Sequence, residues 1–468
     1  MADISEIREG RAMTFGRQLQ LTVALSTPAI LAQLSNIAMQ YIDASMVGHL
    51  GAVPSAAIGL VSSGLWLFGG ICTSVTTGFS VQVAHRVGAK DYEGARHVLR
   101  QGLTTCLAFS LLVALIGVAI AGGYPLWLGG KGEVSSQATL YFGIFMMAIP
   151  LLTMSYFAGA MLRSVGNMKV PSALNILMCV LDCLFNYFLI FPARDIDVGG
   201  TTLHLPGAGL GIVGAALGTV LAEASVAGLM FWYLYRRQPE LRLVGLKGDY
   251  RPDWGVVKRA FHISVPMGLE HGAICGAQIA VTAIVAPLGV VALAANTLAV
   301  TAESLCYMPG YGIGDAATTL VGQSYGAGRR DLLKRFSYIS VGLGMTVMTV
   351  MGVFLWLGAP AIMSLMTPDP AIRSLGAEVL RIEAWAEPMF AASIVTYGVF
   401  VGVGHTVIPA IMNLGSIWVV RLPLALLLVH NHGLRGVWIA MCIELFFRGA
   451  IFLARLFSRK WLPKTPTD

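Results

Sequence analysis

Long apolar segments alternate with short polar breaks along the whole chain. Twelve such segments can be delimited, and at about 1.5 Å per residue each can cross a hydrocarbon core of roughly 30 Å. They cover residues 19–47, 54–84, 98–121, 136–162, 171–192, 207–235, 257–286, 290–322, 334–358, 374–402, 407–429 and 433–457. The predicted organisation is an N-terminal segment, two groups of six spans, a linker between them and a tail: 1–18, 19–235, 236–256, 257–457 and 458–468.

Composition assigns this pattern to a membrane. The chain is 56% hydrophobic and only 12% charged, with a mean hydropathy of +0.73, whereas soluble domains carry about 25% charged residues. The pattern therefore predicts an all-α, multi-pass protein of the cell membrane that contacts the lipid bilayer. The first 18 residues are polar and lack an apolar stretch followed by a cleavage site, so they predict a short surface helix and not a signal peptide.

The two groups of spans are related by an internal repeat. Residues match at a constant offset of 238: Pro28 with Pro266, Leu50-Gly51 with Leu288-Gly289, Gly88-Ala89 with Gly326-Ala327, Pro150 with Pro388, Gly166 with Gly404, Pro171 with Pro409, and Asn175 with Asn413. The register shifts near residues 194–205, where the first repeat has a longer loop. Because six spans return the chain to its starting side, the repeats are parallel, and the pseudo-two-fold axis should lie along the membrane normal.

The distribution of basic residues predicts the orientation. If both termini are cytoplasmic, inner segments hold 24 of the 31 Lys and Arg residues, outer connections hold 5, and Arg421 and Arg448 lie within spans. Such a bias is the usual mark of cytoplasmic loops. It also accounts for the net charge of +7 without a nucleic-acid partner.

The first span contains a single ionisable side chain, Asp43, and a proline, Pro28, which favours helix bending. A carboxylate within a span normally faces a protein interior or a watery cavity. Asp43 could also lie, solvated, at the outer membrane edge.

Three further polar residues should reach the level of Asp43. Asp182 and Asn186 are four residues apart on one helix face, roughly 17 and 23 Å beyond the inner end of their span, and Thr219 lies at roughly 25 Å in the next span. Two carboxylates can share a proton, and the same oxygens could ligate a monovalent cation such as Na⁺. A structural hydrogen-bond network is the alternative.

The second repeat has its own acidic residues in the middle third of the bilayer: Glu270, Glu303 and Glu387. At one level in one bundle, they favour a cavity that responds to cations or protons and that selects cargo. Each could instead pair with Arg421 or Arg448. Asp315 and Glu444 have weaker claims to such a role.

Other functions lack a sequence signal. There is no P-loop, catalytic triad or zinc-ligand spacing, so the sequence predicts no enzyme. The seven cysteines all fall in apolar segments and are interpreted as core residues.

Several motifs together resemble the MATE (multidrug and toxic compound extrusion) family. These are the first span with its Asp-x-x-x-Val-Gly-His-Leu-Gly end, and the segments 160–171, 319–331 and 402–409. The resemblance implies a V-shaped pair of six-helix lobes that exports organic, often cationic, compounds by alternating access against inward H⁺ or Na⁺ flow. It maps the coupling-ion site onto Asp43, Asp182, Asn186 and Thr219. Four features depart from the family pattern. The order Asp182 then Asn186 differs from the usual Asn first, Glu270 lies about one turn earlier than the family's Glu, His85 replaces a usual Gln, and His405 a usual acidic residue.

A lipid-linked precursor flippase with the same architecture is the alternative function. Such a protein should present Arg or Lys to a pyrophosphate, whereas carboxylates outnumber basic residues in these spans. The expected partners are therefore small-molecule substrates, the coupling ion is H⁺ or Na⁺ with no other cofactor, and the protein is expected to be a monomer.

Overall fold

A computed structural model describes residues 3–198, 201–245 and 247–462. The first half of the chain forms a short N-terminal helix, six long helices, one short outer helix and a hairpin: α1 (Ser5–Arg8), α2 (Phe15–Gly48), α3 (Ala52–Gly88), α4 (Tyr92–Ile120), α5 (Tyr124–Trp127), α6 (Gly132–Ser164), α7 (Lys169–Ile190), β1 (Pro192–Val198), β2 (Thr201–Ala208) and α8 (Ile212–Arg236).

The second half repeats this arrangement with more interruptions. Its elements are α9 (Trp254–Val285), a 3₁₀ turn η1 (Ala286–Leu288), α10 (Val290–Gly326), α11 (Arg330–Met366), α12 (Pro370–Ala384), α13 (Glu387–Val403), α14 (Val407–Gly415), a π-helical turn η2 (Ser416–Arg421) and α15 (Leu422–Ser458).

The described residues cross the membrane twelve times. Ten helical stretches are long and apolar enough to span it, and α12 with α13, bent by 58°, makes another. The last of the ten stretches runs for 52 residues from α14 to α15, but it turns back at Gly433, whose backbone is not helical. The predicted spans are thereby confirmed, including the single span over residues 374–402, which the structure divides into α12 and α13.

The hairpin β1–β2 causes the shift in the repeat register. The sixth span, predicted from residue 207, begins at Ile212 because residues up to Ala208 belong to β2. In the second half a tight turn replaces the hairpin: Gly211 and Gly433 adopt nearly the same backbone angles, with φ 57° at both and ψ −128° and −137°. The offset between the repeats is therefore 222 from this turn onward.

The equivalent helices α3 and α10 start in the same way. Helices α3 and α10 both contain 37 residues, and they follow Gly51 at φ 115° and Gly289 at φ 106°. A side chain at either position would be strained at these angles, which explains why both repeats have glycine there. The structure thus confirms the parallel repeat.

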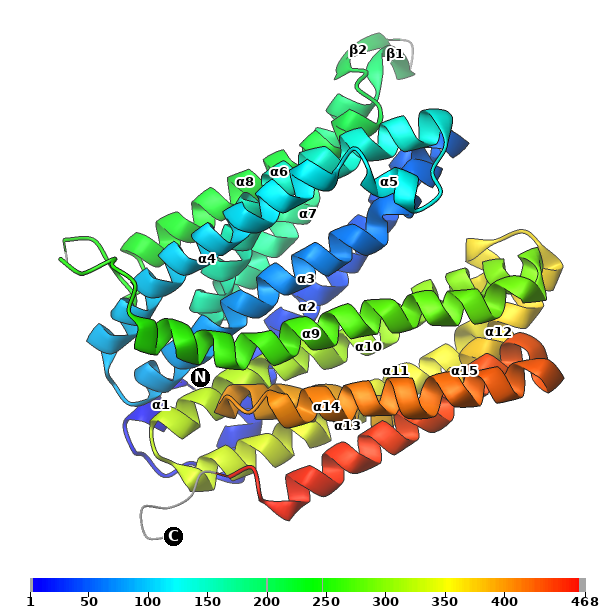
Figure 1. The fold of residues 1–468 in the computed structure, drawn as a ribbon. Helices are drawn as coiled ribbons and strands as arrows, with labels where there is room; N and C mark the ends of the chain where they lie inside the picture. Colours follow the sequence, from blue (N-terminus) through cyan, green and yellow to red (C-terminus); the bar gives the residue numbers. More distant parts are fainter. Residues whose placement is uncertain (1–2, 199–200, 246, 463–468) are drawn as a thin grey trace.

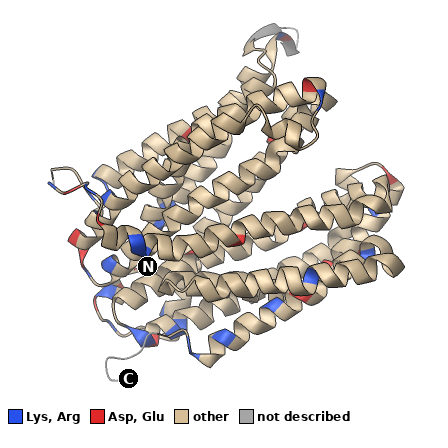
Figure 2. Cartoon of the chain, in the orientation of Figure 1, with Lys and Arg blue, Asp and Glu red and all other residues tan. Residues whose placement is uncertain are grey.

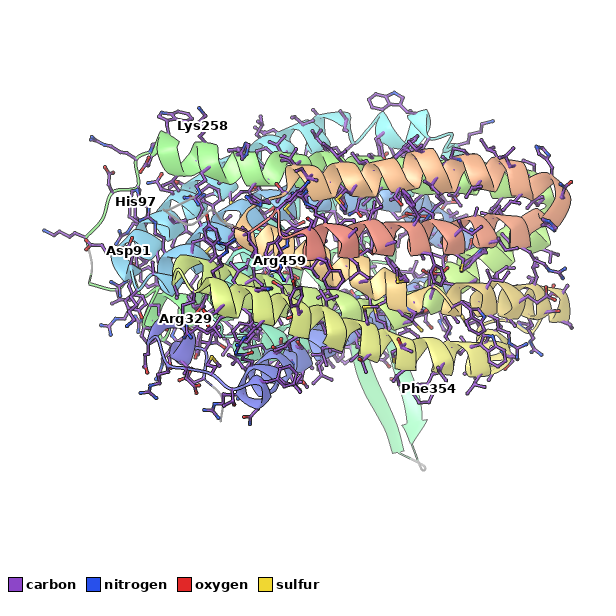
Figure 3. All side chains as sticks on the ribbon, turned by 90° about the horizontal axis from the view of Figure 1, so that it is seen from below. Asp91, His97, Lys258, Arg329, Phe354 and Arg459 are labelled. Atoms are coloured by element: carbon purple, nitrogen blue, oxygen red, sulfur yellow. The ribbon has the colours of Figure 1, made fainter. Side chains whose placement is uncertain are left out.

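Two bundles, α2–α8 and α9–α15, form a V (Figure 1). They converge on the side where both termini lie, which we call the terminal side, and diverge on the opposite side. Helix α2 packs on α10, and by the repeat symmetry α9 packs on α3. Lys and Arg gather on the terminal side, whereas the spans are largely uncharged (Figure 2). Asp91, His97, Lys258 and Arg329 mark this end of the molecule, far from Phe354 (Figure 3).

Candidate functional site

The four polar residues singled out in the first repeat come together inside the N-terminal bundle. The Asn186 amide donates to Asp43 Oδ1 at 2.9 Å and to Asp182 Oδ2 at 3.1 Å. The Asp43 carboxyl group and the Thr219 hydroxyl both interact with Asp182, while the Thr219 hydroxyl donates to the Ala215 carbonyl at 3.2 Å. Asp182 and Asn186 are 0% and 1% exposed. Asp43 itself is partly exposed, and its hydrogen bond with Asn186 joins it to the two buried residues.

The cluster keeps unused acceptor oxygens. Asp182 Oδ1 and Asn186 Oδ1 are buried and have no hydrogen-bond partner. No Lys or Arg forms an ion pair with either carboxyl group among the described residues. Buried acceptors without a donor are costly, so this geometry suits a bound proton or a cation that several oxygens can ligate.

Two neighbours of this cluster were not singled out from the sequence. The Tyr141 ring of α6 interacts electrostatically with both carboxylates, and Glu223, one turn beyond Thr219 on α8, interacts electrostatically with Asp182. The i, i+4 spacing of Thr219 and Glu223 could have indicated the second residue, since it places both on one helix face.

Helix α2 runs unbroken from Phe15 to Gly48 with Pro28 inside it. The bending predicted at Pro28 therefore stays a prediction.

In the C-terminal bundle, Glu270 is a satisfied carboxylate. Tyr397 donates its hydroxyl to Oε2, and Asn413 donates its amide to Oε1, both at 2.5 Å. The side chains come from α13 and α14, so Glu270 of α9 ties three helices together. Tyr397 and Asn413 were not linked to this site from the sequence.

Glu303 and Glu387 lie elsewhere, which corrects the expectation of one cavity shared with Glu270. Neither lines the central cavity. Both are buried, together with Glu383, a third carboxylate that sequence reasoning missed. Both oxygens of Glu383 and of Glu387 have no hydrogen-bond partner, so these groups are expected to be neutral acids.

The two intramembrane arginines bind one carboxylate, Glu444. Arg421 donates to it at 2.6 and 2.9 Å, and Arg448 at 2.7 and 2.9 Å. Ser416 adds a bond at 2.5 Å from the π-helical turn, a type of irregularity that re-aims side chains. The alternative that arginines pair with an acidic residue is thus realised at Glu444, and not at Glu270, Glu303 or Glu387.

A central cavity of about 340 Å³ lies between the two bundles. Its walls carry hydroxyl groups, three tyrosines and both signs of charge: Tyr156, Tyr311, Tyr397, Glu270, Asp315, Arg163 and Arg448. Arg163 lies in the last turn of α6, 5.4 Å over the Tyr156 ring. Apolar and aromatic walls with a few polar groups are typical of a small-molecule site.

Symmetric hydrogen bonds between the bundles close the cavity on the terminal side. His85 of α3 contacts the Gly402 carbonyl through Nε2 at 2.8 Å, and Gln323 of α10 donates to the Ser164 carbonyl at 2.8 Å. Both donor and acceptor pairs are related by the offset of 238. His85, which departs from the family pattern, thus donates a hydrogen bond at the position where the second repeat has Gln323.

The backbones at this closure also touch. A Cβ atom on Gly88 would lie 2.2 Å from the Gln323 carbonyl oxygen, and one on Gly326 would lie 1.9 Å from that of His85. Only glycine allows the two bundles to approach so closely at these positions.

Comparison with known proteins agrees with this architecture. The MatE family model matches residues 28–188 and 266–427, one match in each repeat. The chain belongs to the MatE family. Among relatives, a probable multidrug resistance protein NorM of Thermotoga maritima is 23% identical over 94% of this chain and 92% of its own length.

Another relative and a solved structure extend this likeness. A probable NorM of Bacillus anthracis is 26% identical over 95% of this chain and 96% of its own length. A multidrug resistance MATE transporter solved in an outward-facing conformation has the same fold, with a TM-score of 0.87 and 21% identity over 94% of this chain and 96% of that one. This MatE chain is therefore a multi-pass membrane transporter.

Proposed function

We propose that the protein is a secondary antiporter that exports organic, cationic and amphipathic compounds by alternating access, driven by inward flow of H⁺ or Na⁺. The relatives named as multidrug resistance proteins support this proposal. The observation that carries it is the cluster of Asp43 and Asp182, two carboxyl groups that form no ion pair with a basic residue in the described part of the chain.

Binding of an ion at this cluster would be coupled to conformation. Neutralising a carboxylate in a low-dielectric site changes its free energy by several kcal/mol before relaxation. Two conformations that differ by a few kcal/mol can be biased by such a change. Asn186 and Thr219 complete the set of oxygens that would hold Na⁺, and Asp43 with Asp182 would hold a shared proton.

The terminal side is the cytoplasmic side in this proposal. The bias in basic residues supports this orientation, and the divergence of the bundles on the other side then corresponds to an outward-facing state. A cysteine introduced at Lys131 should react with an impermeant reagent added outside cells, and one at Lys247 should not. The reverse labelling would contradict the orientation.

The substitution Asp43→Asn tests the coupling role. The variant should reach the membrane and bind cargo, yet lose export driven by an imposed H⁺ or Na⁺ gradient in proteoliposomes. Asp249→Asn, which removes an exposed carboxylate of the linker, is the matched control and should transport normally. Wild-type transport by Asp43→Asn would refute the proposal.

A second candidate is the lipid-linked precursor flippase. The observation that favours it is Arg163, which faces the central cavity with Arg448 and could hold an anionic group. Under the antiporter proposal, Arg163→Gln should preserve export of monocationic compounds. Under the flippase alternative, the same variant should abolish transfer of a pyrophosphate-linked lipid, which the wild-type protein would perform.

A further inference from the structure

The segment before the first span lies between the two bundles. Ile7 is fully buried, and Ile4 and Met13 are 9% and 6% exposed. They pack in one apolar cluster whose other members come from both bundles: Leu21, Leu25 and Met168 from the first, and Ala316, Leu320, Leu332 and Phe336 from the second. We call residues 3–13 the N-terminal strap.

Gly166 provides the room for this segment. A Cβ atom on Gly166 would lie 2.7 Å from Ile4, and Gly166 has a positive φ of 93°. The loop between α6 and α7 is thus shaped to receive the strap, which is a fitted element and not a loose polar tail.

Arg8 connects three parts of the molecule through one guanidinium group. It donates to the Val165 carbonyl of the first bundle at 2.7 Å, to Gln323 Oε1 of the second bundle at 3.1 Å, and to Glu240 of the linker at 2.8 Å. The Arg8 side chain is only 6% exposed. Hydrogen bonds to a charged donor are the stronger kind, and their loss leaves a buried charge without partners.

The position of Arg8 links it to the closure between the bundles. Gln323 accepts from Arg8 with its oxygen while its nitrogen donates to Ser164, so one amide belongs to both the strap and the closure. A second bond reaches the strap from the far bundle, since Arg329 donates to the Arg11 carbonyl at 2.7 Å. Separation of the bundles would break Arg8 away from either Val165 or Gln323.

We propose that the N-terminal strap holds the terminal side of the transporter closed, and that Arg8 must leave its site before this side can open. The inference rests on the alternating access described above, but not on the identity of cargo or ion. The strap stabilises one conformation of the cycle, and its removal shifts the population toward the state open on the terminal side.

Hydrogen–deuterium exchange of the full-length protein in nanodiscs tests this without cargo or gradient. Arg8→Gln should speed exchange by about tenfold in peptides that cover the terminal-side ends of α3 and α10, residues 80–90 and 318–328. Peptides at the opposite ends of these helices should exchange more slowly, because that side closes. Glu240→Gln should give a smaller change of the same sign.

Arg11→Gln is the matched control, because its side chain is 70% exposed and only its carbonyl contacts the second bundle. It should leave exchange unchanged. If exchange in Arg8→Gln is faster only in residues 3–13, the terminal side stays closed without the strap. This result would overturn the proposal. If Arg8→Gln does not fold, the exchange pattern of Glu240→Gln decides by the same criterion. If Arg8→Gln shows the expected exchange pattern while Asp43→Asn transports normally, the proposed coupling role of Asp43 is wrong and the inference about the strap stands.

Discussion

The two bundles have the same arrangement of helices, but the buried carboxylates Asp182 and Glu444 have opposite surroundings. The N-terminal bundle holds Asp43 and Asp182 without a basic partner, whereas the C-terminal bundle surrounds Glu444 with Arg421 and Arg448. Positions related by the repeat do not carry matching charges.

The residues equivalent to Arg421, Glu444 and Arg448 are Cys183, Ala222 and Val226. Conversely, Asp182 corresponds to Val420 and Asp43 to Val281. Under the proposed function, a bound proton or cation would neutralise the N-terminal cluster, whereas Glu444 is neutralised by Arg421 and Arg448 of its own bundle. The first arrangement suits a site that loads and unloads, and the second suits a permanent structural element.

The largest effect should come from breaking the internal ion pairs of the C-terminal bundle. Glu444→Gln leaves Arg421 and Arg448 buried side by side without a counter-charge, and removal of one partner from such a site costs about 3–5 kcal/mol. Thermal unfolding in detergent, followed by size-exclusion chromatography, should show a strongly destabilised or misfolded protein. A variant as stable as wild type would mean that Glu444 is not the counter-charge.

The equivalent loss in the N-terminal bundle should have the opposite sign. Asp182→Asn removes a buried carboxyl group that lacks a basic partner, so we expect stability to be unchanged or raised by about 1 kcal/mol. The same variant should lose gradient-driven export. A large fall in the thermal unfolding temperature would show that a compensating group exists and would abolish the contrast between the bundles.

Much of this contrast could be predicted from the sequence. The constant offset defined the repeat, and helical arithmetic placed Asp43, Asp182, Asn186 and Thr219 at one level, where the structure brings them together. These predictions succeed because helix rise and the width of the membrane fix the depth of each residue.

Contacts between helices could not be predicted in this way. Depth does not say which way a helix face turns, so Glu270 could not be separated from Glu303 and Glu387, and the partners Tyr397 and Asn413 were missed. The π-helical turn that brings Ser416 to Glu444 and the bend between α12 and α13 have no clear local signal.

A smaller effect should distinguish the acidic residues of the C-terminal bundle. Glu270→Gln removes the only one of the three predicted carboxylates that lines the cavity, so we expect export of cationic compounds to fall by about tenfold, the loss of one charge-assisted contact. Glu303→Gln and Glu387→Gln should change export less, because these side chains are buried outside the cavity. Resistance measurements with a panel of cationic compounds would check the order. Equal losses of export in all three variants would support the shared cavity that the sequence predicts.

The smallest effect concerns equivalent helix starts on the terminal side. Asp91 begins α4 and accepts from the Gly94 amide at 2.8 Å, whereas its repeat partner Arg329 begins α11 without a side-chain cap.

The hydrogen bond from the Gly94 amide lowers the pKa of Asp91 below its usual 3.8. Burial opposes this shift, and the Arg86 side chain adds to it. Because the folded-state pKa is the lower one, the cap stabilises the protein above the unfolded-state value and loses this effect as pH falls through the folded-state value. We therefore expect Asp91→Ala to cost about 1 kcal/mol at pH 7 and much less at a pH below the folded-state pKa of Asp91, as measured by denaturant unfolding. Arg329→Ala, as the matched change in the other bundle, should show no such pH dependence, and a pH-independent loss in Asp91→Ala would mean that packing, and not the cap, stabilises this end of α4.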